Sequence, residues 1–203
     1  MEHDHPSAAN IIALYNEGAE EWDRVRKGNL IEQSWLERFR ALLPSQGCVL
    51  DLGCGGGDPI AGYFLQHGYD VCGVDSSAPL IRLCQQRFPQ GEWHLGDMRT
   101  LALDKTFSGV IAWDSFFHLT RSDQRKMFPV FHQHCQPGTA LIFTSGPENG
   151  EALGEFIGQT LYHASLGNDE YRQLLDENGF QVVKQLTEDP QCGGRTVWLA
   201  QVR

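Results

Sequence analysis

Residues 49–59 read VLDLGCGGGDP, an apolar run that ends in an acid and then breaks into five small residues. A short apolar run bounded by turn residues predicts a buried β-strand. The glycines that follow free the backbone for a tight turn, which a ligand can approach closely. In open α/β sheets, ligands bind beyond the carboxyl ends of the strands. The stretch therefore predicts an α/β fold with a nucleotide-type site at residues 53–57.

Strand patterns and helix patterns alternate along the rest of the chain. This alternation predicts a parallel sheet with helices on both faces, and the last two strands, which have no helix between them, should form an antiparallel pair. Ser122 and Asn168 are expected to cap their helices, and Pro129 is expected to kink or shorten one of them. Helices are predicted at 7–26, 30–43, 59–67, 78–88, 122–135 and 168–179, and strands at 48–52, 69–75, 92–97, 107–113, 139–145, 180–186 and 195–202.

Length and composition favour one domain without a nucleic-acid or membrane partner. The 203 residues suit a single domain, with 1–44 as a helical cap and 45–203 as the core. The net charge of −10 disfavours nucleic acid and anionic membranes, which attract basic patches. No apolar stretch reaches the length of a membrane span, and the N-terminus lacks a secretory signal pattern. Scattered cysteines without a CxxC pair suit a reducing compartment, so we expect a cytoplasmic protein. We also expect the chain to be a monomer or a homodimer.

Two further acids stand at the ends of predicted strands. Asp75 follows Gly53 by 22 residues, and its carboxylate can accept hydrogen bonds from both hydroxyls of a ribose. Asp97 ends the next strand and can accept from an exocyclic amine such as that of adenine, while Met98 can pack on a base. The pattern therefore predicts a ligand with a sugar and a base.

The residue after the glycines argues against a phosphate in that ligand. Asp58 stands where the dinucleotide pattern GxGxxG needs glycine or alanine. A carboxylate there cancels the positive potential that a helix N-terminus offers to a phosphate. We expect a cationic group of the ligand near Asp51 instead.

The motif DLGCGGG at 51–57, the acid at 75 and the motif GDM at 96–98, in this order, resemble the class I S-adenosylmethionine-dependent methyltransferases. The resemblance covers about residues 45–203. It implies a Rossmann-like, doubly wound seven-stranded sheet, mostly parallel with an antiparallel last strand, and with helices on both faces. It also implies S-adenosyl-L-methionine as the cofactor and S-adenosyl-L-homocysteine as its product.

The resemblance implies roles for individual residues in holding the cofactor. The glycine turn would pass under the methionine part, with Asp51 near its amino group. Asp75 would hold the ribose, and Asp97 the adenine. Cys54 lies within the turn, where its small size suits the position better than any reactivity. The implied cofactor-binding residues are Asp51, Gly53, Cys54, Gly55, Asp75, Ser76, Asp97, Met98, Trp113 and Tyr15.

Candidate catalytic residues lie in two segments. The segment WDSFFHL at 113–119 resembles the family's stretch near the methyl group and acceptor, so Asp114 and His118 are candidates. His118 would act as a general base, or else be a buried histidine with its hydrogen bonds satisfied. His163 lies in the segment 161–171, read as a connector that covers the acceptor. Arg195 could reach inward to an anionic acceptor, although a charge at the strand edge is the favoured interpretation.

The N-terminal helices are the family's variable part and often close over the cofactor. Trp22, Arg24 and Arg26 are candidates there, and one basic residue could pair with the cofactor carboxylate. No metal site is expected, because His132 and His134 point to different sides of a helix and His3 and His5 stand in the N-terminal tail.

The sequence therefore predicts methyl transfer to a small-molecule acceptor by in-line displacement. An oxygen acceptor would need help from a base, whereas a thiol or an amine needs only to be deprotonated. Two alternatives remain at this point. One is an NAD-dependent oxidoreductase on a related sheet, and the other is a non-catalytic module that binds S-adenosylmethionine.

Overall fold

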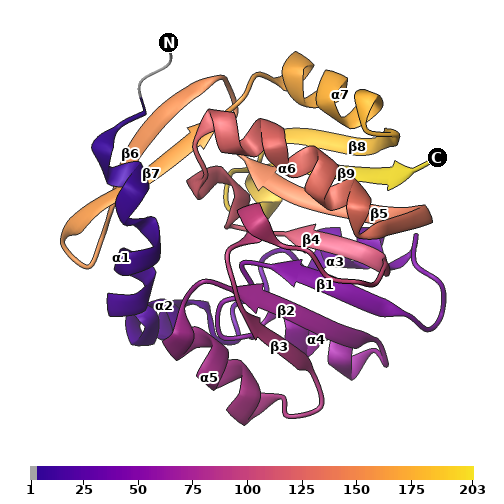
Figure 1. Cartoon of the computed structure of the whole chain (residues 1–203), viewed down its shortest axis with the longest axis horizontal. Helices are drawn as coiled ribbons and strands as arrows, with labels where there is room; N and C mark the ends of the chain where they lie inside the picture. Colours follow the sequence, from indigo (N-terminus) through magenta and orange to yellow (C-terminus); the bar gives the residue numbers. More distant parts are fainter. Residues whose placement is uncertain (1–3) are drawn as a thin grey trace.

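The computed structural model describes residues 4–203, and one seven-stranded sheet forms its centre (Figure 1). The strands of this sheet are β1 (Cys48–Leu52), β2 (Asp70–Asp75), β3 (Glu92–Leu95), β4 (Phe107–Ala112), β5 (Cys135–Ser145), β8 (Phe180–Asp189) and β9 (Arg195–Val202). Their spatial order is β3-β2-β1-β4-β5-β9-β8. Strands β1 to β5 pair in parallel, and β9 runs antiparallel to both β5 and β8.

This topology confirms the predicted doubly wound sheet with a reversed last strand. The chain moves outward from β1 to β3 and then returns to place β4 on the other side of β1. The order therefore reverses between β1 and β4, which is the switch point where open α/β sheets bind ligands beyond the strand ends.

Helices cover both faces of the sheet. Trp35, Phe39 and Phe64, from α3 and α4, are buried against one face. Phe128 and Tyr171, from α6 and α7, are buried against the other. The α-helices are α1 (Ile11–Glu17), α2 (Ala19–Arg26), α3 (Gln33–Arg40), α4 (Ile60–Gln66), α5 (Ala78–Arg87), α6 (Arg121–Gln133) and α7 (Asn168–Glu177), and the 3-10 helices are η1 (Pro6–Asn10), η2 (Met98–Thr100), η3 (Phe116–His118) and η4 (Pro190–Cys192).

The helix expected at 7–26 is divided into η1, α1 and α2. The break falls at Gly18, where a Cβ atom would lie 2.4 Å from the ring of Phe156. The aromatic ring would have to move to admit a side chain at residue 18, and the helix is interrupted there between α1 and α2.

The segment 161–171, read as a connector, instead contains the end of a β-hairpin, at residues 161–165, and the start of α7 (Asn168–Glu177). Strands β6 (Gly150–Phe156) and β7 (Gln159–Ser165) form a separate two-stranded sheet, which lies beside α1 away from the main sheet (Figure 1). Most of β6 is exposed, so it lacks the alternation of apolar and polar residues that would have marked it as a strand.

The N-caps predicted for α6 and α7, and the effect predicted for Pro129, differ from the structure. The N-cap of α6 is Thr120, whose hydroxyl accepts from the Asp123 N–H, and not Ser122. Asn168 is the first residue of α7, and Gly167 precedes it as the N-cap. Helix α6 also continues through Pro129 to Gln133 and is not shortened there.

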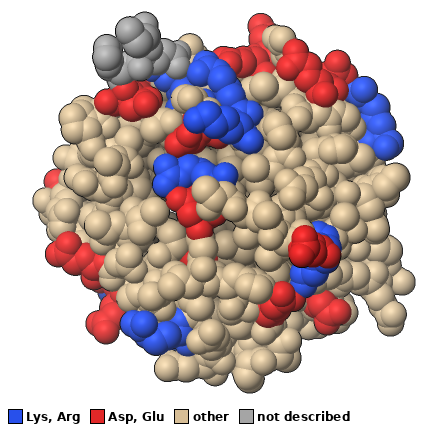
Figure 2. Space-filling view, viewed as in Figure 1, with Lys and Arg blue, Asp and Glu red and all other residues tan. Residues whose placement is uncertain are grey.

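The described residues add three observations, on helix length, cysteines and surface charge. None of the helices within residues 4–203 is long and apolar enough to cross a membrane. All six cysteines are free thiols. On the face shown in Figure 2, basic side chains lie in separate small groups next to acidic ones.

Candidate functional site

The glycine-rich turn after β1 is fixed by the neighbouring strand. The N–H groups of Gly53 and Cys54 both donate to the Val74 carbonyl, at 2.8 and 3.1 Å. Gly53 and Gly55 have φ values of +74° and +57°, in the left-handed region that favours glycine. At Gly53 a Cβ atom would also lie 2.3 Å from Cβ of Ser115. Both conformation and space therefore require glycine at this position.

Asp75 at the end of β2 is tied to the same turn. Its two carboxylate oxygens accept hydrogen bonds from the N–H groups of Gly55, at 2.9 Å, and Ser77, at 2.8 Å. Burial raises the pKa of Asp75, and these backbone donors oppose the rise. The carboxylate is thus held in a fixed orientation and keeps lone pairs with which to accept further hydrogen bonds.

A cavity opens beside this carboxylate, at the switch point of the sheet. Ten of the residues predicted from the sequence line it: Tyr15, Trp22, Gly53, Gly55, Asp75, Ser76, Asp97, Met98, Asp114 and His118. Apolar side chains of the first helices and of α5 complete the wall, among them Ile11, Ile12 and Leu80. The structure therefore brings together residues from five separate segments of the chain, at 8–22, 53–55, 74–80, 96–99 and 114–120.

A smaller second cavity adjoins the first and contains the other predicted cofactor residues. Asp51, Cys54 and Trp113 line it, and Trp22 and Gly55 belong to both cavities. Burial, and then the neighbouring Asp75 carboxylate, raise the pKa of Asp51 to about 7, while Arg26 opposes this rise.

An unpaired donor also lies in this second cavity. The indole Nε1 of Trp113 is buried and has no hydrogen-bond partner among the described residues. A buried donor of this kind is costly unless a ligand or water satisfies it. A carboxylate next to an unpaired indole N–H suits a group that carries an ammonium and a carboxylate, as the methionine part of S-adenosylmethionine does.

Tyr15 and His118 form a hydrogen-bonded chain at the wall of the larger cavity. Nδ1 of His118 lies 2.8 Å from the Tyr162 carbonyl oxygen, and Nε2 lies 2.9 Å from the Tyr15 hydroxyl. Because a carbonyl oxygen can only accept, Nδ1 carries the hydrogen, and Nε2 accepts from Tyr15. Burial lowers the pKa of His118 to about 4, so the ring is neutral at pH 7.

Asp114, directly after β4, is paired and not free. Its carboxylate accepts three hydrogen bonds from the Arg195 guanidinium, at 2.7 to 3.0 Å. Arg195 begins β9 and was expected to be a charge at the strand edge. That expectation is wrong, because its side chain points inward and reaches a residue of the site. The pairing across 81 residues carries no signal in the sequence.

The remaining candidates lie around these two cavities. His163 of β7 lies outside the set that lines the cavities and packs against the His118 ring, with centroids 4.9 Å apart. Asp97 is held by Arg99, whose Nε donates to both carboxylate oxygens at 3.0 Å. Arg99, which also lines the larger cavity, was not found from the sequence.

Trp22 of helix α2 covers the glycine-rich turn. Nε1 of Trp22 would lie 3.2 Å from a Cβ atom at Gly55, so the indole covers the turn. The two candidate arginines are engaged in ion pairs: Arg26 with the buried Glu32, and Arg24 with the exposed Glu21. Arg26 still lines the smaller cavity.

Comparison with known proteins agrees with this geometry. Residues 49–138 match the family model described as a methyltransferase domain. This matched segment contains the glycine turn and the strand-end acids Asp51, Asp75 and Asp97 of the site.

Solved structures share the fold across most of this chain. The 1,6-didemethyltoxoflavin-N1-methyltransferase of Burkholderia thailandensis, with S-adenosylhomocysteine bound, has a TM-score of 0.77 at 19% identity and covers 100% of this chain and 91% of its own. The magnesium protoporphyrin IX methyltransferase of Synechocystis, with S-adenosylmethionine bound, has a TM-score of 0.73 at 17% identity and covers 100% of both chains.

Curated relatives match over shorter stretches. A trans-aconitate 2-methyltransferase of Azoarcus is 34% identical over 110 residues, which is 50% of this chain and 40% of the relative. A dTDP-3-amino-3,4,6-trideoxy-α-D-glucopyranose N,N-dimethyltransferase of Streptomyces venezuelae is 27% identical over 51% of this chain and 44% of the relative. The match spans less than half the length of these two curated relatives.

Proposed function

We propose that this protein transfers a methyl group from S-adenosyl-L-methionine to a small-molecule acceptor. The observation that carries the proposal is the Asp75 carboxylate, fixed by the N–H groups of Gly55 and Ser77 at the wall of a cavity at the sheet's switch point. A carboxylate held in this way is suited to accept both hydroxyls of a ribose.

The two cavities divide the cofactor between them. Asp51 and the Trp113 indole N–H would hold the ammonium and carboxylate of the methionine part in the smaller cavity. Asp75 and Ser76 would hold the ribose in the larger one, with Asp97 and Met98 at the adenine. The bound cofactor supplies a methyl group on a sulfonium, which is reactive without further activation.

Tyr15 and His118 would position the acceptor. The Tyr15 hydroxyl donates to His118, which leaves lone pairs on the phenol oxygen to accept an N–H or O–H from an acceptor in the cavity. The neutral His118 ring, fixed by the Tyr162 carbonyl, keeps that hydroxyl oriented. Asp114 would form part of the wall, as its carboxylate is engaged by Arg195.

The two alternatives fit the geometry less well. In an NAD-dependent oxidoreductase a pyrophosphate would lie at the start of α4, where Asp58 and Asp23 line the smaller cavity. A module that only senses the cofactor would need no space beside Asp114 and His118, yet both side chains line the larger cavity.

We also propose a cytoplasmic location, because free thiols are typical of a reducing compartment.

Calorimetric titration with S-adenosylmethionine, S-adenosylhomocysteine and NAD tests the proposal. We expect both sulfur compounds to bind and NAD not to bind. Asp75→Ala should weaken binding at least tenfold, about 1.4 kcal/mol. Asp70→Ala, at the opposite end of the same strand, is the matched control and should bind like the wild type. Binding of NAD alone would replace this proposal by an oxidoreductase.

A further inference from the structure

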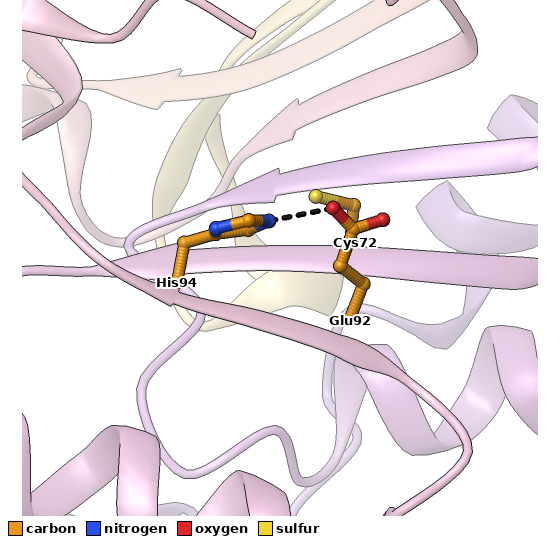
Figure 3. A group of neighbouring side chains, drawn as sticks. All are labelled: Cys72, Glu92 and His94. Atoms are coloured by element: carbon orange, nitrogen blue, oxygen red, sulfur yellow. Dashed lines mark hydrogen bonds and ion pairs between the residues drawn. The ribbon is translucent and has the colours of Figure 1, made fainter.

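A second group of chemically active side chains lies at the edge of the sheet. Cys72 comes from β2, and Glu92 and His94 come from β3 (Figure 3). Their sulfur, oxygen and nitrogen donor atoms all lie within 4.8 Å of one another. None of the three residues lines either cavity of the proposed cofactor site.

Strand pairing creates this group. Cys72 lies directly opposite Glu92 in the parallel pair, and His94 follows Glu92 by two residues, so all three side chains stand on one face of the sheet. Cys72 is buried, whereas the side chains of Glu92 and His94 are 47% and 38% exposed. The core therefore fixes the thiol, and the other two donors can move and can be reached from solvent.

We propose that Cys72, Glu92 and His94 bind one divalent transition-metal ion of the zinc class, with water completing the coordination. Thiolate, imidazole and carboxylate are the donors that Zn²⁺ takes in proteins, and three protein ligands with one open position is a common arrangement. Tetrahedral bond lengths of about 2.0 to 2.3 Å place donors roughly 3.5 Å apart. Small rotations of the two exposed side chains would bring the donors to that spacing.

The ion would replace contacts that the group makes without it. Nε2 of His94 lies 2.7 Å from Oε1 of Glu92, and the Lys105 ammonium pairs with the other oxygen of Glu92. A divalent ion would take the place of that ammonium, and the Cys72 thiol would release its proton to solvent on binding. Lys105 is therefore a competitor of the metal.

The site differs from the expectation that the chain holds no metal. No ligand spacing in the sequence marks it, because the Cys and the His belong to different strands and only the register of β2 and β3 joins them. The group spans the edge strand β3 and its neighbour β2, outside both cavities, so the ion would fasten β3 to β2 and would take no part in methyl transfer.

Titration of the metal-free full chain with Co²⁺ and Zn²⁺ tests the site. His3, which lies outside the described residues, and His5 are replaced by Gln in every variant to remove a competing terminal site. We expect one ion per chain and an absorption band from charge transfer between thiolate and cobalt. Cys72→Ser should abolish the band, and His94→Gln should weaken binding at least tenfold. Lys105→Ala should tighten it.

Two controls test whether the cobalt band comes from Cys72 and not from another thiol, and whether a substitution acts on metal binding and not on folding. Cys135→Ser, at a half-buried thiol of β5, should leave the cobalt band unchanged. Zn²⁺ should raise the melting temperature of the parent protein and not that of His94→Gln, whose exposed side chain is not needed for folding. Absence of a thiolate band in the parent, or its persistence in Cys72→Ser, would overturn the proposal. Neither readout depends on cofactor binding or methyl transfer.

Discussion

Arg195 holds the Asp114 carboxylate through three hydrogen bonds, although 81 residues separate the two. Asp114 has a φ of +50°, a backbone conformation that costs energy for any residue with a side chain. Its N–H donates to the Thr144 hydroxyl, and its carboxylate lies 7% exposed. The ion pair therefore joins the segment that follows β4 to the start of the antiparallel strand β9.

Replacing Arg195 by Gln should leave the Asp114 carboxylate buried without its partner. Breaking a buried ion pair costs roughly 3–5 kcal/mol, and because the Arg195 side chain is 25% exposed we expect a loss of about 2 kcal/mol. Urea unfolding measures this change. The double variant Asp114→Asn/Arg195→Gln should recover part of the loss, since it removes the stranded charge. Simple addition of the two single losses would show that the pair is not coupled.

His118 should make stability depend on pH below neutrality. Burial lowers its pKa in the folded state to about 4, against 6.5 in the unfolded state. The unfolded chain therefore binds more protons between these values, and the folded state loses stability as the pH falls through this window. Between pH 7 and pH 5 the loss should be about 2 kcal/mol larger for the wild type than for His118→Gln. Equal pH slopes in urea unfolding would mean that the ring titrates normally.

Asp51 should change the stability of the fold with pH in the direction opposite to His118. Its pKa is raised to about 7 in the folded state, so the folded chain binds more protons than the unfolded chain between pH 4 and 7 and loses stability as the pH rises. Asp51→Asn should therefore have a higher free energy of unfolding in urea than the wild type, by about 4 kcal/mol at pH 8 and by about 2 kcal/mol at pH 5. The same variant should bind S-adenosylmethionine at least tenfold more weakly. A variant that gains stability and keeps its affinity would separate Asp51 from the cofactor.

The parts of the site that lie next to strand ends could be predicted from the sequence. Asp51, Asp75 and Asp97 each follow or end an apolar run, and parallel strands bring such ends to one edge of the sheet. Local chemistry in the chain therefore sufficed to predict that these three acids and the glycine turn gather at the same edge of the seven-stranded sheet, where they line two adjoining cavities.

The rest of the site depends on pairings between distant segments. The contacts Tyr15–His118 and Asp114–Arg195 span 103 and 81 residues, and no periodicity records them. The β6–β7 hairpin was missed for another reason. Its first strand is mostly exposed, so it lacks a buried face, and the hairpin packs through β7 on η1, α1, η3 and α6. Phe156 at the end of β6 adds ring contacts with Tyr15 and Trp22.

Phe156 and Gly18 should behave as a size-matched pair that couples the hairpin to the site. The Phe156 ring lies 5.5 Å from that of Tyr15 and 6.2 Å from that of Trp22, and Trp22 covers the glycine turn. Because a Cβ atom at Gly18 would lie 2.4 Å from this ring, Gly18→Ala should displace α1 and α2 and weaken binding of S-adenosylmethionine about tenfold.

Phe156→Ala should also weaken that binding, since Tyr15 and Trp22 lose the ring that they pack against. In the background of Phe156→Ala, however, Gly18→Ala should have little further effect, because the space that it needs is then empty. Calorimetric titration of the two single variants and the double variant measures the coupling. Leu153→Ala, at an exposed residue of the same strand, is the control and should bind as the wild type does. Independent, additive losses from Gly18→Ala and Phe156→Ala would mean that the hairpin does not act on the cofactor site through this contact.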